Sequence, residues 1–290
     1  MRPLKGTGLT RYSPIYRTIS VRCMLMLIGI LFLLTACLKP TEYSHYASWY
    51  PKDEQVQQFV RAAEFGDIEK VRSMMRAGFN PDDVFTNQGS PLIALPVLAK
   101  QPAVLKAMLE EGADPNVKKQ YDTGDRGIRN HNNAMVWAAK ADSPEYLAIL
   151  IDHGGDPDTR NSNDETLMMQ ARLWGDSWEN VKTLVLKGAD VNGTSQTRTL
   201  AESYSGLGSF MKVLWLLEHG ADLSKDTRAN KATLESIFWH PYSTTDSSWQ
   251  KKCQRWALDR GFVRPPLPDY YKRMRQRLDM PAEEADIPLL

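Results

Sequence analysis

The chain of 290 residues has few of the features that mark a catalytic or metal-binding protein. It has no G-x-S-x-G or H-E-x-x-H motif, no glycine-rich loop of the phosphate-binding type and no C-x-x-C pair. These absences argue against a serine hydrolase, a zinc protease, a nucleotide-binding enzyme and a thiol redox protein. We therefore expect a protein that is not an enzyme and that needs no metal or other cofactor.

Cysteine is also scarce, with only Cys23, Cys37 and Cys253 in the chain. We place Cys23 in a cleaved N-terminal segment and Cys37 at a lipidation site, for reasons given below. Cys253 is then alone, so we expect no disulfide within the chain. Its thiol is expected to pack beside a helix, because free cysteines are commonly buried and unreactive.

The chain lacks a surplus of positive charge beyond residue 37. The first 37 residues hold five of the 36 basic groups and no acid, so 31 basic residues stand against 35 acidic ones in the rest. A protein that binds duplex nucleic acid needs a basic face. We therefore do not expect nucleic acid as the partner.

No apolar run is long enough to cross a membrane. The longest, residues 24–34 (MLMLIGILFLL), has eleven residues, whereas about 30 Å of hydrocarbon needs roughly 20. This run follows a basic stretch, as the apolar part of a signal peptide does. Residues 34–37 (LTAC) then resemble the bacterial lipobox L-[AST]-[GA]-C. The resemblance implies that Cys37 becomes the diacylated first residue of the mature protein.

The residue after Cys37 is Leu38. An Asp at this position would resemble the signal that retains Gram-negative lipoproteins in the inner membrane. By this resemblance we expect a protein anchored by lipid in the outer membrane of a Gram-negative bacterium and facing the periplasm. Several acyl chains hold a protein far more firmly than a single one.

What the rest of the chain contains is a repeat, in which a helix ends at a glycine followed by a short polar turn. Successive glycines of this kind are separated by 34, 42, 34, 32 and 41 residues. They are Gly78, Gly112, Gly154, Gly188, Gly220 and Gly261. Glycine ends a helix readily because it adopts positive φ without strain. The spacing is close to the ankyrin period of 33, with an insertion in each of the two long intervals.

The repeat resembles the ankyrin pattern TPLHxAAxxGxxxxVxxLLxxGADxN. Residues 89–92 (GSPL) match its opening and residues 188–192 (GADVN) match its close. The resemblance implies an all-α ankyrin-repeat solenoid of helix-turn-helix units with hairpin fingers, made of five repeats and a degenerate C-terminal cap. Pro96 falls within a first helix, which predicts that this helix is short or kinked.

The same pattern divides the chain into four parts. We assign a lipoprotein signal peptide to residues 1–37, a tether to 38–52, the ankyrin-repeat domain to 53–264 and a C-terminal tail to 265–290. The tail is rich in proline and then basic, which is consistent with either one packed helical turn or a loose end.

An insertion at residues 118–132 lengthens the finger between the second and third units. Long loops in compact domains are often functional, and Tyr and Arg are favoured at binding hot spots. From this finger we predict four partner-binding residues: Tyr121, Arg126, Arg129 and His131.

The second candidate surface is the concave face, to which the variable positions of each first helix point in ankyrin folds. At such positions we predict four further partner-binding residues: Trp137, Lys140, Gln170 and Trp174. The same register places Arg61, Glu64, Phe65, Leu173, Ser203 and Leu207 on this face. Large aromatic side chains are unusual where water is expected. A register shifted by one residue would instead place them in the core.

A lipobox followed by ankyrin units resembles immunity proteins of type VI secretion phospholipase effectors. The resemblance implies a protein, monomeric when free, that binds a secreted phospholipase toxin and occludes its catalytic cleft. The alternative is a periplasmic ankyrin partner that supports a resident enzyme such as a catalase.

Overall fold

The computed structural model describes residues 44–122, 124, 127–241 and 247–290. The chain separates into two units, residues 1–45 and 46–290, and the second holds nearly all of the described residues. Cys37, the apolar run before it and Arg126 lie outside the described residues. Within the described part, no helix combines the length and the apolar character that a membrane span requires.

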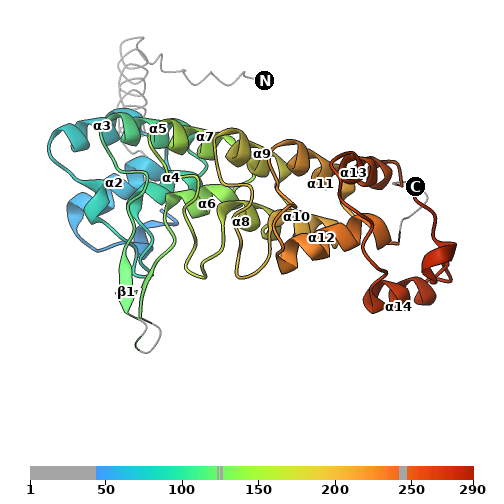
Figure 1. Cartoon of the computed structure of the whole chain (residues 1–290). Helices are drawn as coiled ribbons and strands as arrows, with labels where there is room; N and C mark the ends of the chain where they lie inside the picture. The colour runs from blue at the N-terminus through green and yellow to red at the C-terminus, as the bar shows by residue number, and fades with distance from the viewer. Residues whose placement is uncertain (1–43, 123, 125–126, 242–246) are drawn as a thin grey trace, which may run out of the picture. The chain divides into compact units, whose positions relative to one another are not determined.

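Within the described residues of the second unit, helices form six successive helix-turn-helix pairs (Figure 1). The first five pairs are α2 (Glu54–Glu64) with α3 (Ile68–Arg76), α4 (Leu95–Leu98) with α5 (Pro102–Glu110), α6 (Ala134–Lys140) with α7 (Glu145–Asp152), α8 (Leu167–Leu173) with α9 (Trp178–Leu186), and α10 (Leu200–Ser205) with α11 (Phe210–Glu218). The sixth pair is α12 (Arg228–Trp239) with α13 (Ser247–Asp259), and α14 (Asp269–Arg277) follows it. Short 3-10 turns lie at η1 (Ala47–Trp49), η2 (Pro81–Asp83), η3 (Leu92–Ala94) and η5 (Glu284–Asp286).

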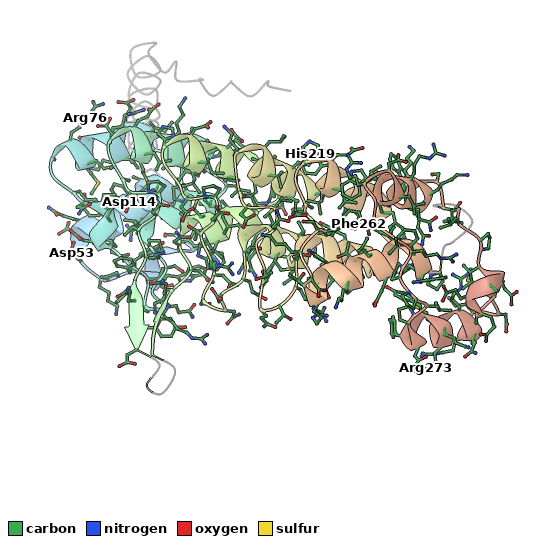
Figure 2. The ribbon with its side chains drawn as sticks, viewed as in Figure 1. Asp53, Arg76, Asp114, His219, Phe262 and Arg273 are labelled. Carbon is green, nitrogen blue, oxygen red and sulfur yellow. The ribbon has the colours of Figure 1, made fainter. Side chains whose placement is uncertain are left out.

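The pairs stack in chain order, so that first helices form one row and second helices another (Figure 1). Side chains fill the space between the rows (Figure 2). Phe59, Leu105, Leu147 and Val213 are among the residues with no exposed surface there. Because each unit buries its apolar side only against its neighbours, the core is continuous along the stack. It runs from Tyr50 to Ile287, so a body of residues 38–290 contains all of it.

The six glycines predicted to end second helices all have positive φ, from 82° at Gly261 to 102° at Gly220. The polar residues after them join neighbouring turns. The backbone N–H of Asp190 donates to the Asp158 carboxylate at 2.7 Å, and that of Asp222 donates to Asn192 Oδ1 at 2.8 Å. The prediction of polar turns is confirmed for the first five units, in which each turn also helps to fix the next, whereas Phe262 and Val263 follow the sixth glycine.

Pro96 lies at the start of α4, which has only four residues and follows directly on the turn η3. The prediction of a shortened first helix in the second unit is confirmed. Proline is tolerated here because the first residues of a helix need no intrahelical N–H bond.

Asn180 joins the third and fourth units from a position 1% exposed on α9. Its Nδ2 donates to the backbone oxygens of Ala139 at 3.1 Å and Ala141 at 2.8 Å, where α6 ends. Replacing Asn180 with Ala leaves these buried carbonyls without a donor. We expect a loss of about 2 kcal/mol in the free energy of unfolding and a melting temperature lower by several degrees.

Thermal unfolding followed by circular dichroism measures this effect, with the exposed Asn163→Ala as the control that should melt like the parent. Equal melting temperatures for the Asn180 variant and the parent would contradict the role given to this amide.

The folded unit begins at Tyr46, not at residue 53. Tyr50 is only 2% exposed, and the Tyr46 hydroxyl donates to the Leu98 backbone oxygen at 2.9 Å. The prediction of a tether is therefore wrong for residues 46–52. Their aromatic side chains pack against the first unit because it has no preceding unit to bury its open end.

Residues 265–290 also belong to the folded unit. The nine-residue α14 buries Tyr271 and Arg275, and the Trp239 indole N–H donates to the Pro265 backbone oxygen at 2.9 Å. Neither of the expected forms, a single helical turn or a loose end, describes this segment. It packs around the end of α12 and completes the cap of the stack.

Candidate functional site

The inserted finger is a β-hairpin that projects away from the stack (Figure 1). Its strands are β1 (Gln120–Asp122) and β2 (Ile128–Asn130), paired antiparallel with Tyr121 opposite Arg129. The His131 N–H donates to the Lys119 backbone oxygen at 2.8 Å and extends the pairing toward the base. The described part of the insertion is therefore a paired arm that could reach a partner beside the repeats.

Three of the predicted finger residues anchor this hairpin. The rings of Tyr121 and His131 lie 4.3 Å apart, and the His131 ring fills the space beside Gly89, where a Cβ would come within 2.4 Å of it. Arg129 Nη1 donates to the Ser162 backbone oxygen at 3.2 Å. Burial lowers the pKa of His131, which favours the neutral ring at pH 7. Tyr121, Arg129 and His131 therefore set the position of the finger.

Trp137, Lys140 and Trp174 meet on the side formed by the first helices. The Lys140 ammonium lies 5.3 Å from the centre of the Trp137 ring and 4.4 Å from that of Trp174. Two cation–π contacts hold the charge between two indoles from neighbouring units. Desolvation lowers the pKa of Lys140, whereas the charge of Glu165 raises it.

Lys140 forms no hydrogen bond and no ion pair within the part of the chain that the structure describes. An ammonium group has three donors, and here the two indoles shield part of it from water. A carboxylate or carbonyl oxygen from another molecule would supply the missing acceptor.

Trp174 is 62% exposed and directly precedes Gly175, which has a φ of 118° at the turn after α8. Phe65 and Leu207 precede the equivalent glycines of the first and fifth units and are 42% and 61% exposed. All three are exposed, as the predicted register requires. Together they line the edge of the first-helix row with exposed apolar side chains.

Gln170 is 1% exposed, so the prediction that it lies on the accessible face is wrong. Its Nε2 donates to Glu165 Oε2 at 2.6 Å. Gln170 lies one turn before Trp174, where α8 is covered by its contact with α6. Glu64 is also buried, one residue before the exposed Phe65, so the prediction is wrong for it too.

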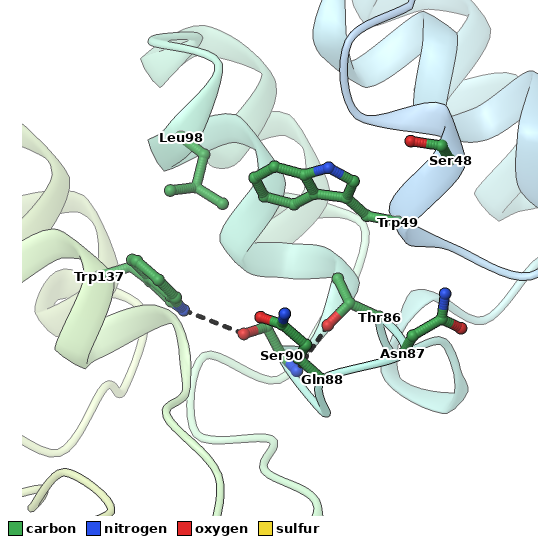
Figure 3. A pocket seen from close by; sticks show the side chains of 8 residues that line it. All are labelled: Ser48, Trp49, Thr86, Asn87, Gln88, Ser90, Leu98 and Trp137. Atoms are coloured by element: carbon green, nitrogen blue, oxygen red, sulfur yellow. Dashed lines mark hydrogen bonds between the residues drawn. The ribbon is translucent and has the colours of Figure 1, made fainter.

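Two adjoining pockets share Trp137 and Leu98. The first, of about 360 Å³, lies between these two side chains, Trp49 and the loop of Thr86 and Ser90 (Figure 3). The Trp137 indole N–H donates to Ser90 Oγ at 3.3 Å on its rim. The second pocket, of about 330 Å³, continues past Trp137 to Lys140 and Trp174. We call the two pockets together the inner groove.

Trp49 is a groove residue that sequence reasoning missed, because it lies in the segment assigned to a tether. It is 40% exposed, and its ring meets that of Tyr46 edge to face at 5.0 Å. The signal was the density of aromatic residues at 43–50 (YSHYASWY), which is unusual for a solvated linker.

Comparison with known proteins agrees with this architecture. A family model of ankyrin repeats (3 copies) matches residues 97–195. The BTB/POZ domain and ankyrin repeat-containing protein NBCL of Lotus japonicus is 33% identical over 113 residues, which is 38% of this chain and 20% of that protein. The solved ankyrin repeat domain of Bcl-3, a member of the IkappaB family, has a TM-score of 0.55 and 20% identity over 71% of this chain and 86% of its own. The fold is an ankyrin-repeat solenoid.

An ankyrin-repeat fold is typically a non-catalytic module that binds proteins. The described residues hold no group of His, Cys, Asp or Glu that could bind a metal ion. Cys253 has no exposed surface, and burial raises the pKa of its thiol to about 12. The prediction of a packed thiol agrees with this burial. The inner groove is therefore the candidate site, and its chemistry is that of an interface.

Proposed function

We propose that this protein is anchored by lipid in the outer membrane and inhibits a secreted phospholipase toxin by occluding its catalytic cleft. The proposal that this protein binds a partner rests on the inner groove. There Trp137 and Trp174 present two indole faces, and Lys140 presents a cation without an acceptor among the described residues. Tryptophan is enriched at binding hot spots. A protruding apolar side chain beside a carboxylate would fit this groove.

The groove is too small to form a whole interface, so we expect other residues of the first-helix row to contact the partner as well. Two pockets of about 360 and 330 Å³ hold a few side chains, whereas a stable interface buries about 1,600 Å² in total. Phe65 and Leu207 extend the apolar edge along the stack, and the hairpin finger stands beside its N-terminal part. We propose that the groove anchors the toxin and that the finger flanks it.

The toxin assignment comes from the lipobox at Cys37 combined with ankyrin units, the combination that resembles immunity proteins of phospholipase effectors. Lipidation would place the inhibitor beside the lipid substrate of the toxin. A resident periplasmic enzyme such as a catalase is the second candidate partner. It would bind in the same groove and would be supported, not inhibited, by this protein.

Inhibition is tested by titrating the body of residues 38–290 into the purified phospholipase. We expect hydrolysis to fall in proportion to the added protein and to stop near one equivalent, because occlusion is stoichiometric. Full hydrolysis in the presence of a tenfold excess would overturn the inhibitory function.

Replacing Cys37 with Ser removes the thiol that would carry the lipid. We expect the variant to leave the outer-membrane fraction and to appear in the soluble periplasmic fraction, as measured by sedimentation and immunoblotting. Cys23→Ser is the matched control and should stay with the membrane. If the Cys37 variant continues to sediment with the outer membrane, the anchor is not at this residue.

A further inference from the structure

Helix α13 is the second helix of the sixth pair, and its charged residues differ from those of the second helices before it. Several cations on or directly after the earlier second helices pair with acids of a neighbouring unit, as in Arg72 with Glu110 and Glu111, and Lys187 with Asp152. By contrast, none of the exposed cations of α13 and of the turn directly after it forms an ion pair with any residue that the structure describes. These cations are Lys251, Lys252 and Arg255 on α13 and Arg260 in the turn.

The unpaired charge is also a regional surplus. Residues 247–277 contain nine basic and two acidic residues, whereas residues 38–246 contain 22 basic and 29 acidic ones. The excess of positive charge in the folded unit therefore lies in the region of α13 and α14, because residues 278–290 add four acidic residues and no basic one.

Indole rings lie beside two of these cations. Lys252 Nζ is 3.8 Å from the centre of the Trp249 ring, and the Arg260 guanidinium is 4.3 Å from that of Trp256. The spacing of three or four residues places Trp249, Lys252 and Trp256 along one side of the helix, with Arg260 in the turn that follows. The adjoining side, with Gln250, Cys253 and Ala257, is buried, and α13 packs there against α11 and α12.

Exposed apolar side chains also lie near the end of the helix. Leu258 is 40% exposed and Val263 is 79% exposed. The Phe262 ring stacks against Trp256 with their centres 6.1 Å apart. We call Trp249, Lys251, Lys252, Arg255, Trp256 and Arg260, together with these apolar residues, the α13 face.

We propose that the α13 face binds an anionic phospholipid surface. Lysine and arginine attract anionic headgroups, and tryptophan prefers the interface between headgroup and hydrocarbon. Helices that lie on membranes combine these residues with exposed apolar ones. The face lies on the row of second helices, whereas the inner groove lies on the row of first helices. A protein partner and a membrane could therefore be bound at the same time.

The proposal concerns the folded body and does not depend on the lipid anchor or on the toxin. The body of residues 38–290 is mixed with vesicles of phosphatidylglycerol and phosphatidylethanolamine, or of phosphatidylcholine alone, and sedimented. We expect binding to the anionic vesicles only, and its loss at 0.5 M salt because salt screens exposed charges. Absence of binding to the anionic vesicles, or equal binding to both kinds, would overturn the proposal.

A variant with Lys251, Lys252, Arg255 and Arg260 each changed to Gln tests the assigned residues. We expect its affinity for anionic vesicles to fall roughly a hundredfold or more, because each cation near an anionic surface contributes about a factor of five. The control changes four exposed cations elsewhere, Arg61, Lys70, Lys118 and Lys225, to Gln and should bind within about threefold of the parent. Equal losses in the two variants would show that net charge, and not the α13 face, governs binding. Melting temperatures check that both variants fold.

Discussion

Changing Trp137 and Trp174 together to Ala is expected to weaken partner binding by about three orders of magnitude while the protein stays folded. The two indoles border Lys140, and Trp137 also separates the two pockets. Truncating a hot-spot residue costs about 2 kcal/mol or more in binding free energy, so two would remove about 4 kcal/mol. Trp174 is 62% exposed in the free protein, so its removal creates little buried cavity.

Titration calorimetry with the purified partner measures the loss, and circular dichroism checks the fold. Tyr270→Ala is the matched control, because Tyr270 is an aromatic residue 59% exposed on α14, away from the groove. A second variant, with Tyr121 and Arg129 changed to Ala, separates the finger from the groove. If the Trp137 and Trp174 variant binds with the affinity of the parent, the inner groove is not the interface.

Changing Trp239 to Ala is expected to affect folding and not the groove, with a large loss of stability at the C-terminal end of the stack. Trp239 has no exposed surface, its indole N–H donates to Pro265, and the Arg264 guanidinium lies 3.8 Å from its ring centre. The Arg275 guanidinium also donates to its backbone oxygen at 3.4 Å. Removing a buried tryptophan costs about 3–5 kcal/mol.

In a repeat protein this loss is concentrated in the units that contact the altered residue. We therefore expect the segment from residue 264 onward to become sensitive to protease and to lose amide protection, while the first four units stay protected. Trp174→Ala, an equal truncation at an exposed position, is the control and should leave protection unchanged. Uniform loss of protection along the whole stack would contradict the local role given to Trp239.

The repeat architecture could be predicted from sequence because its signals are local. A glycine that ends a helix recurs in every unit and the polar turn after it in the first five, and each has its own physical reason. The short helix at Pro96 follows from one residue. The exposed positions of Phe65, Trp174 and Leu207 follow from their place before the turn glycine.

The ends of the solenoid could not be predicted in this way. Residues 46–52 and 265–290 do not follow the repeat, and their packing depends on the shape of the open end that each covers. Burial of Gln170 also escaped prediction, because it depends on how closely α8 approaches α6. The same holds for Lys140, whose two indole contacts come from units whose relative placement no local pattern encodes.

The central claim, that the inner groove binds a secreted phospholipase, is tested most directly by comparing two baits. The body of residues 38–290 and its Trp137 and Trp174 double-alanine variant are each used to capture proteins from the secreted and envelope fractions of the native organism, and mass spectrometry identifies what is bound. We predict that the parent recovers a phospholipase in a one-to-one complex and that the variant does not. Recovery of a resident periplasmic enzyme in its place, or of the same proteins by both baits, would contradict the account.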